Sequence, residues 1–308
     1  MATPIITDGS TDRVRPFPQV VLPAGAELFI DRAARLDALA ANHSMADYLR
    51  VLAALTRAQA DAYGAQLAGP VAQKQLDSSR DYGMPPLSAQ SHERGAAWRA
   101  DLRAIMAAMA ARTEPGVISA LAELGKMGDS DIEALADRVL AGTTLDADAA
   151  LVPFVGGALQ VYFTRLAASL DAASVSRCDV PTICPVCATR PVASVVRLGG
   201  DRNNLRYLAC ALCATEWHMT RVLCSSCQQE KSLHYLTIEQ EGREVQRAVA
   251  RAEACDECKS YLKIFYQEYD ASAEPVADDL ATLALDLLVD ERGFARSGPN
   301  LLIHPGSG

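Results

Sequence analysis

The sequence predicts an α+β protein with a helical N-terminal domain, two tandem four-cysteine modules built on β-hairpins, and a C-terminal helix. The first 177 residues contain no cysteine, and their apolar side chains recur three and four positions apart, which is typical of helices. All nine cysteines lie between residues 178 and 258, where the apolar pattern changes to the alternation of strands. We therefore expect four parts, which cover residues 1–180, 181–222, 223–265 and 266–308.

The composition is that of a globular chain with a sizeable buried core. The 308 residues are 50% hydrophobic and 22% charged, and the mean hydropathy is +0.04. No apolar run reaches the roughly 18 residues that a membrane-spanning helix needs. The N-terminus also lacks the basic stretch and apolar core of a secretory signal. We therefore expect a cytoplasmic protein with no membrane span.

Helices are expected throughout the N-terminal domain. Ser44 and Asp47 open one of them, and Ser130 and Glu133 form a capping-box pair that opens another. Residues 66–91 contain three prolines and are predicted to form a loop, because proline lacks an amide donor and constrains the residue before it. Further helices are expected, from their apolar periodicity, at about residues 26–41, 92–111 and 152–173.

Two β-hairpins and one helix are expected after residue 180. The first hairpin runs over residues 192–198, turns at residues 199–204 and returns over residues 205–209. The second runs from Leu233 to Glu239 and turns at Glu241 and Gly242, and its returning strand passes through Val245 and Val249. The helix, at about residues 276–291, would place four side chains on one face, namely Leu280, Leu283, Leu287 and Leu288.

Eight of the nine cysteines form four Cys-x-x-Cys pairs. Two intervening residues allow a tight turn, or knuckle, to aim both sulfurs at one ion, and two knuckles complete a tetrahedral four-thiolate site. Four pairs with identical spacing therefore predict two metal sites. Zinc and iron both accept four thiolates in this geometry, so the spacing does not choose the metal. The pairs are Cys184 and Cys187, Cys210 and Cys213, Cys224 and Cys227, and Cys255 and Cys258.

The lengths between the knuckles favour pairing of consecutive knuckles. The first and third spans, of 22 and 27 residues, contain turn signals that let each span reverse and bring its ends together. The middle span of ten residues has no Gly, Pro or Asn, and when extended it would separate its ends by about 30 Å. Crossed pairing, of the first knuckle with the third and the second with the fourth, is the alternative. The expected sets are Cys184, Cys187, Cys210 and Cys213 (site 1) and Cys224, Cys227, Cys255 and Cys258 (site 2).

Other chemistry of the cysteines fits the sequence less well. A thioredoxin-like redox pair begins a helix, whereas these pairs lie between expected strands. Disulfides are disfavoured in the cytoplasm. An iron electron-transfer site stays open, although no glycine follows the second cysteine of any pair, where the residues are Ala188, Ala214, Gln228 and Lys259.

The remaining candidate residues are expected to have structural roles. Cys178 is predicted to be a small buried or half-buried apolar side chain rather than a ninth ligand. His218 and His234 are expected at wet strand edges, and a hydrogen bond to a cysteine sulfur is the alternative. We attribute Asp278 and Asp279 to the dipole at a helix start. The sequence has no phosphate-binding loop, nucleophile elbow or His-Glu-x-x-His motif, so we predict that the protein is not an enzyme.

The charge of the chain argues against nucleic acid as a partner. The whole sequence carries a formal net charge of −9. Residues 181–262 hold ten basic and nine acidic side chains, and two divalent ions in four-thiolate sites would add about −4. A basic surface supplies most of the affinity for nucleic acid. We therefore expect no nucleic-acid partner.

Seven motifs together resemble those of one known family. They are Gly-Met-Pro-Pro-Leu at residues 83–87, Cys-Pro-Val-Cys at 184–187, Arg-Tyr-Leu-Ala-Cys-Ala-Leu-Cys at 206–213, Glu-Trp-His-Met-Thr-Arg at 216–221, Cys-Ser-Ser-Cys at 224–227, Cys-Asp-Glu-Cys-Lys-Ser-Tyr-Leu-Lys at 255–263 and Ala-Asp-Asp-Leu-Ala-Thr-Leu-Ala-Leu-Asp at 277–286. In these motifs, which span most of the chain, the sequence resembles the formate dehydrogenase accessory proteins of the FdhE family. One departure is Ala188, where glycine is expected after the first knuckle.

The resemblance implies a function as well as a fold. Proteins of this family are cytoplasmic factors that are needed to produce active respiratory formate dehydrogenase, and they are not catalysts. The resemblance further implies contact with the catalytic subunit of the dehydrogenase and rubredoxin-like iron in the four-cysteine sites. We therefore expect two rubredoxin-like or zinc-ribbon-like modules that hold two metal ions, with iron ahead of zinc.

The expected role is that of a chaperone-like factor for maturation or quality control. Tyr207, Trp217 and Tyr235 would lie on its partner-binding face, or alternatively in the core. Two other functions stay open: an iron redox protein and a zinc-ribbon regulator that binds nucleic acid.

Overall fold

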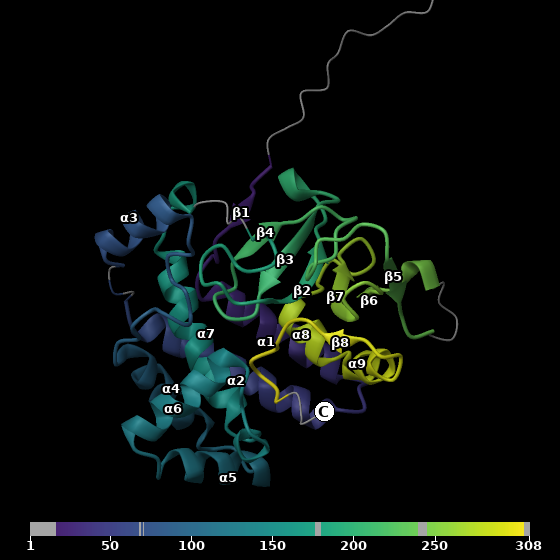
Figure 1. The fold of residues 1–308 in the computed structure, drawn as a ribbon. Coiled ribbons are helices and arrows are strands. Elements are labelled where there is room, and N and C mark those ends of the chain that lie inside the picture. The colour runs from purple at the N-terminus through teal and green to yellow at the C-terminus, as the bar shows by residue number, and fades with distance from the viewer. Residues whose placement is uncertain (1–16, 68, 70, 176–179, 240–244, 305–308) are drawn as a thin grey trace, which may run out of the picture.

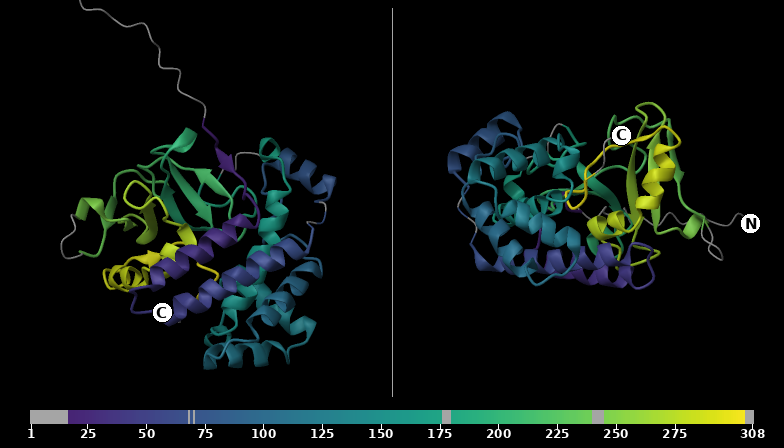
Figure 2. Two further views of the ribbon diagram at one scale, coloured as in Figure 1. Left: turned by 180° about the vertical axis from the view of Figure 1, so that it is seen from behind. Right: turned by 90° about the horizontal axis from the view of Figure 1, so that it is seen from below.

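The computed structural model describes residues 17–67, 69, 71–175, 180–239 and 245–304. Helices of the first half lie beside a mixed sheet of the second half, and α1, α8 and α9 lie along the sheet (Figures 1 and 2). The predicted α+β class is thus confirmed, with the helical region first, the two four-cysteine clusters after it, and helix again near the C-terminus.

The helical half is organised around α7. This helix is buried along nearly its whole length and is mostly apolar, because it packs against α2, α4 and α6. The helices are α1 (Glu27–Ala40), α2 (Ala46–Ala65), α3 (Gln73–Tyr82), α4 (Ala97–Met109), α5 (Pro115–Leu124), α6 (Asp129–Ala141) and α7 (Val152–Ala168).

Two of these helices differ from the sequence prediction. The expected loop at residues 66–91 contains α3, which ends at Gly83 in the left-handed conformation. Helix α3 has almost no apolar residues, so hydrophobic periodicity could not reveal it. Helix α5 was not predicted either, although Pro115 occupies a first-turn position where proline is tolerated.

The predicted helix caps are also different. Helix α2 begins after Met45, without a side-chain cap from Ser44. Helix α6 begins after Gly128 and has no side-chain cap. The Glu133 carboxylate instead accepts a hydrogen bond from Trp98 Nε1 at 2.9 Å, so it joins α6 to α4.

The strands of both cysteine modules form one sheet. Within the described residues its order is β1-β4-β3-β2-β7-β6-β5, and β8 pairs with β7. All neighbours are antiparallel except β2 with β7 and β7 with β8. The parallel β2–β7 pair is therefore the seam between the modules. The strands are β1 (Val20–Val21), β2 (Pro191–Val196), β3 (Arg206–Cys210), β4 (Glu216–His218), β5 (Leu233–Leu236), β6 (Ala250–Cys255), β7 (Ser260–Tyr266) and β8 (Ala295–Arg296).

The second hairpin departs from its predicted bounds. Its returning strand, β6, begins at Ala250, whereas Val245 lies in a short 3-10 helix over Val245–Arg247. The predicted turn at Glu241 and Gly242 lies outside the described residues. The hairpin itself is present, because β5 and β6 pair in antiparallel register from Leu233 with Cys255 onward.

The expected C-terminal helix is divided into α8 (Pro275–Leu280) and α9 (Leu283–Asp290). The four predicted leucines therefore do not share one buried face: Leu280 is fully buried, whereas Leu287 is 68% exposed and Leu288 is 46% exposed. Leu285 takes the buried position of α9, where it packs with Val289 against the second module.

Of the two aspartates assigned to a helix start, Asp278 does lie in the first turn of α8 and accepts a hydrogen bond from the N–H of Glu274, whereas Asp279 lies outside that turn. Asp278 accepts two hydrogen bonds from Arg35 of α1, which ties α8 to α1. Asp279 has no exposed surface, and its carboxylate lies 2.9 Å from Lys263 Nζ and 2.7 Å from Arg296 Nη2. These aspartates are buried structural anions that dock α8 on the rest of the molecule.

The C-terminal segment passes tightly between the two halves. A Cβ atom at Gly156 of α7 would lie 2.0 Å from the carbonyl oxygen of Leu301, and one at Gly298 would lie 1.7 Å from that of Pro191. No larger residue fits at either position without a shift of the backbone. The two glycines thus allow one strap of chain to touch both the helical half and the first module.

Candidate metal centres

The eight paired cysteines gather in two groups of four. One group contains Cys184, Cys187, Cys210 and Cys213, the other Cys224, Cys227, Cys255 and Cys258, and the four sulfurs of each group all lie within 4.8 Å of one another. These are the sets expected from consecutive pairing, and the crossed alternative does not occur. The middle span separates the two knuckles because its strand β4 pairs antiparallel with β3 and therefore runs away from site 1.

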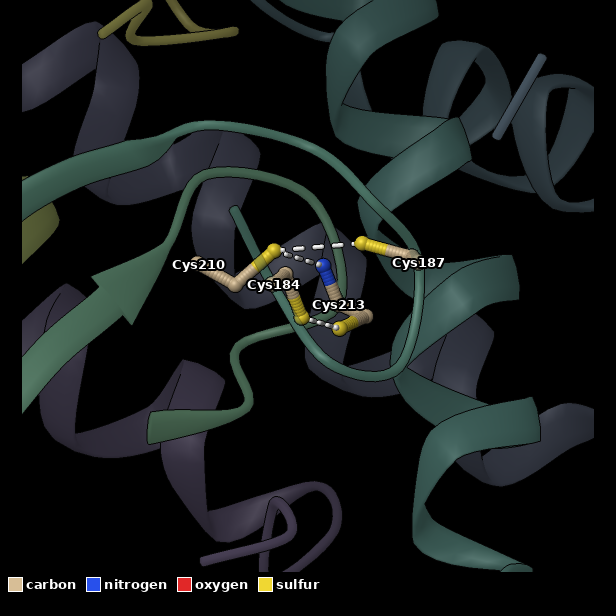
Figure 3. Close-up of side chains that lie close together, drawn as sticks. All are labelled: Cys184, Cys187, Cys210 and Cys213. Atoms are coloured by element: carbon tan, nitrogen blue, oxygen red, sulfur yellow. Dashed lines mark hydrogen bonds between the residues drawn. The ribbon is translucent and has the colours of Figure 1, made fainter. Parts of the chain in front are cut away.

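In site 1, each cysteine of the first knuckle faces one cysteine of the second knuckle (Figure 3). The sulfurs of Cys184 and Cys213 are 3.6 Å apart, and those of Cys187 and Cys210 are 3.3 Å apart. The backbone N–H groups of Leu212 and Cys213 point at the sulfur of Cys210. Such N–H donors stabilise negative charge on a thiolate.

Site 2 repeats this arrangement in the second module. The sulfurs of Cys224 and Cys258 are 3.8 Å apart, and those of Cys227 and Cys255 are 3.7 Å apart. The N–H of Ser226 donates to the sulfur of Cys224 at 3.4 Å.

The spacing of the sulfurs fits a tetrahedral ion. Four thiolates about 2.3 Å from one zinc or iron ion would lie about 3.8 Å from one another, close to the distances found here. A disulfide would need about 2.05 Å, which neither pair of facing sulfurs in either site approaches. Each cluster could therefore hold one metal ion. Burial raises the pKa of the Cys184 and Cys210 thiols well above their usual value, so four thiolates in site 1 need a cation to compensate them.

Each knuckle is closed by a residue in the left-handed conformation. The residue after the second cysteine has a positive φ in every knuckle: Ala188 (62°), Ala214 (55°), Gln228 (62°) and Lys259 (52°). Glycine adopts this conformation without strain, whereas a residue with a Cβ atom loses about 1–2 kcal/mol. The four knuckles therefore have the same geometry without glycine at this position, but the backbone of these residues is strained.

Replacing Gln228 by glycine is expected to raise the free energy of unfolding by about 0.5–1 kcal/mol, because it removes this strain from an exposed position. Chemical denaturation of the metal-loaded protein measures the change. The neighbouring Gln229→Gly is the matched control, since φ at Gln229 is not positive, and this substitution should destabilise the protein. Equal effects of the two substitutions would contradict the assignment of strain to Gln228.

The helical half covers site 1. The N–H groups of Leu87 and Ala89 donate to the carbonyls of Val186 and Cys187, at 2.8 and 2.9 Å. From α7, Gln160 Nε2 donates to the carbonyl of Ala211 at 2.9 Å. All four cysteines of site 1 are buried and belong to the main apolar core of the molecule. The Pro-Pro-Leu motif thus holds the first knuckle, a role that its sequence alone did not reveal.

Site 2 is open on one side. Cys224 and Cys255 are buried, whereas Cys227 is half-buried and Cys258 is exposed. Burial raises the pKa of the Cys224 thiol to about 12. At Cys258 desolvation acts in the same direction, but hydrogen bonds from Ser260 outweigh it and lower the pKa to about 7.

A buried ion pair crosses the seam between the modules. Arg206 of β3 donates to the Glu253 carboxylate of β6 at 2.7 Å, and their side chains are 0% and 1% exposed. Arg206 also donates to the carbonyl of Leu223, which directly precedes the first knuckle of site 2. The Tyr235 hydroxyl donates to the Glu253 carboxylate, and desolvation of the hydroxyl raises the pKa of Tyr235 to about 12. Sequence patterns gave no sign of this network.

The aromatic side chains expected on a partner-binding face are mostly in the core. Tyr207 has no exposed surface, and Trp217 is 4% exposed. Their polar atoms donate to the carbonyls of Pro18 and Pro181, so both residues have the core role that was the alternative. Tyr235, at 43% exposure, is the one of the three that reaches the surface.

The histidines and the ninth cysteine complete the predicted set. His218 lies on β4 and packs against Phe17 and Tyr207, so it is not at a sheet edge, because β1 pairs with β4. His234 lies on β5, at the end of the sheet, with its ring near Phe294. Cys178 lies outside the described residues.

Comparison with known proteins decides the family. Three sequence models match the chain. The model described as "FdhE, N-terminal" matches residues 17–179, "FdhE, central domain" matches residues 183–221, and "FdhE, C-terminal domain" matches residues 222–303. The chain belongs to the FdhE family. The "Protein FdhE homolog" of Pseudomonas aeruginosa is 40% identical, over 99% of both chains. That of Pseudomonas putida is 42% identical, over 94% of this chain and 92% of the relative.

A solved structure has the same fold. The crystal structure of the FdhE protein from Pseudomonas aeruginosa has a TM-score of 0.85 and 40% sequence identity, and it covers 94% of this chain and 100% of its own. In this FdhE chain, no helix of the described residues combines the length and the apolarity that crossing a membrane requires.

Proposed function

We propose that this FdhE chain is a chaperone-like accessory factor for the maturation or quality control of respiratory formate dehydrogenase. It acts in the cytoplasm, binds the catalytic subunit of the dehydrogenase through its metal-stapled modules, and catalyses no reaction itself. The observation that carries this proposal is the gathering of eight cysteines into two four-sulfur clusters in a chain of the FdhE family.

The proposed cofactors are two metal ions, one in each cluster. Cys184, Cys187, Cys210 and Cys213 would hold one ion, and Cys224, Cys227, Cys255 and Cys258 the other. A bound ion would cross-link two knuckles, and iron would also supply a one-electron couple. We place iron ahead of zinc because the resemblance of the cysteine motifs to those of the family implies rubredoxin-like iron. Metal analysis of protein purified without oxygen distinguishes the two.

A co-purification experiment tests the partner. The tagged chain, produced in a host that lacks its own FdhE protein, is expected to retain the catalytic subunit of formate dehydrogenase and to restore dehydrogenase activity. The Cys224→Ala/Cys227→Ala variant should reduce both to the level of the host without the factor, because site 2 loses half of its ligands. Cys178→Ser is the matched control, because Cys178 belongs to none of the four Cys-x-x-Cys pairs. Full binding and activity with the double variant would argue against a role for site 2.

An iron redox function is the second candidate, because Cys227 and Cys258 bring site 2 to the surface. It requires visible thiolate-to-iron absorption that disappears on reduction and returns on oxidation. A colourless protein that contains only zinc would exclude this function.

A further inference from the structure

The first knuckles of the two modules have the same backbone geometry. In module 1 the N–H of Ala188 donates to the carbonyl of Cys184, and in module 2 the N–H of Gln228 donates to that of Cys224. The amide of each first cysteine in turn bonds the carbonyl five residues on, at Thr189 or Gln229. The two knuckles would therefore bind their ions with the same local backbone structure.

The two knuckles differ in how far the rest of the molecule covers them. The carbonyls of Val186 and Cys187 in module 1 receive N–H bonds from Leu87 and Ala89 of the helical half. The matching knuckle in module 2, over residues 224–227, becomes progressively more exposed toward Cys227. The last knuckle is more open still: Asp256, Glu257 and Cys258 are all exposed. Leu262 and Phe265 of module 2 belong to the main core, but the rest of the module packs around a small core of its own, which contains no cysteine.

Site 2 is consequently divided into an anchored and an open half. Cys224 is anchored because Arg206 donates to the carbonyl of Leu223 just before it, and Cys255 ends strand β6, which lies between β5 and β7. Cys227 and Cys258, the second cysteines of their knuckles, face solvent. Removing two of four ligands from an ion in site 2 thus requires only a local opening, whereas site 1 opens only when the main core separates.

We propose that the ion of site 2 exchanges with ligands in solution while the ion of site 1 stays enclosed. This inference rests on the proposed occupancy of both clusters. In the exchange step the ion passes to a competing chelator, whose donor atoms replace the sulfurs, and the released thiolates take up protons from the buffer. Site 1 then maintains the fold, and site 2 is the point where metal is gained, lost or contacted by a partner.

Release of zinc to the chelator 4-(2-pyridylazo)resorcinol tests the inference. The full chain, loaded with two zinc ions, is expected to release one ion in a fast phase and the other at least about tenfold more slowly, a difference of about 1.4 kcal/mol in opening free energy. The Cys227→Ser/Cys258→Ser variant should bind one ion and show only the slow phase. Ala89→Pro removes the N–H that bonds Cys187, so it should accelerate the slow phase.

Alkylation of the wild-type protein assigns the phases without any substitution. During chelation, N-ethylmaleimide should modify Cys227 and Cys258 before any cysteine of site 1, as followed by peptide mass spectrometry. Two ions released in a single phase, or site 1 modified first, would overturn this inference alone. A chain that takes up fewer than two ions under every loading condition would overturn the proposed occupancy along with it.

Discussion

Replacing Arg206 by methionine is expected to lower the free energy of unfolding by about 3–5 kcal/mol. The substitution leaves the Glu253 carboxylate buried without its cation, because both side chains are essentially inaccessible to solvent. It also removes the donor to the carbonyl of Leu223. Urea denaturation of the metal-loaded protein measures the loss, which is large against the total stability of an ordinary domain.

A double-mutant cycle separates the ion pair from its packing. Arg206→Met/Glu253→Leu should be less destabilised than the sum of the two single variants, since no charge is then left unpaired. The matched control is Arg57→Met, which breaks the exposed ion pair with Asp37 and should change stability by less than about 1 kcal/mol. A comparable loss of stability in Arg57→Met and Arg206→Met would contradict the inference that burial makes the Arg206–Glu253 pair costly to break.

Cys213→Ser is expected to destabilise the protein by at least about 4 kcal/mol, because it removes one of four ligands from a site that lies within the main core. Removal of the metal with a strong chelator should have a similar effect, since four buried thiols would then lack the ion that holds them together. Thermal unfolding followed by circular dichroism, with and without metal, measures both changes.

The contrast between the two sites gives this prediction its control. Cys258→Ser alters an exposed ligand of site 2, outside the main core, and should cost much less than Cys213→Ser. A larger loss of stability with Cys258→Ser would show that site 2, and not site 1, maintains the fold.

The sequence predicted those elements whose signals are local. Helix α1 and the hairpin of β2 and β3 lie close to their expected positions, because amphipathic periodicity and a glycine-rich turn specify them. Helix α3 has a polar sequence with Ser79 as its one buried residue, and Gln75 ties it to the following segment through the carbonyl of Pro86 and the ring of His92. The division between α8 and α9 likewise depends on Thr282, whose hydroxyl donates to the carbonyl of Asp278.

The candidate sites were predictable for a similar reason. The spacing within each knuckle is fixed by the reach of two sulfurs to one ion, and the lengths of the intervening spans selected the consecutive sets. The surroundings of the sites were not predictable. Gln160, Arg206 and Asp279 interact with partners that are far away in the sequence. A charged residue that will be buried looks the same in the sequence as one on the surface, because only the fold places its partner beside it.

The parallel pairing of β2 with β7 has a consequence for synthesis on the ribosome. Strand β2 belongs to the first module, but one of its edges is completed only by β7, at the end of the second. A nascent chain that has emerged through site 1 therefore carries an open strand edge, a common start of aggregation, until β7 follows. Truncation between the modules would make that transient edge permanent.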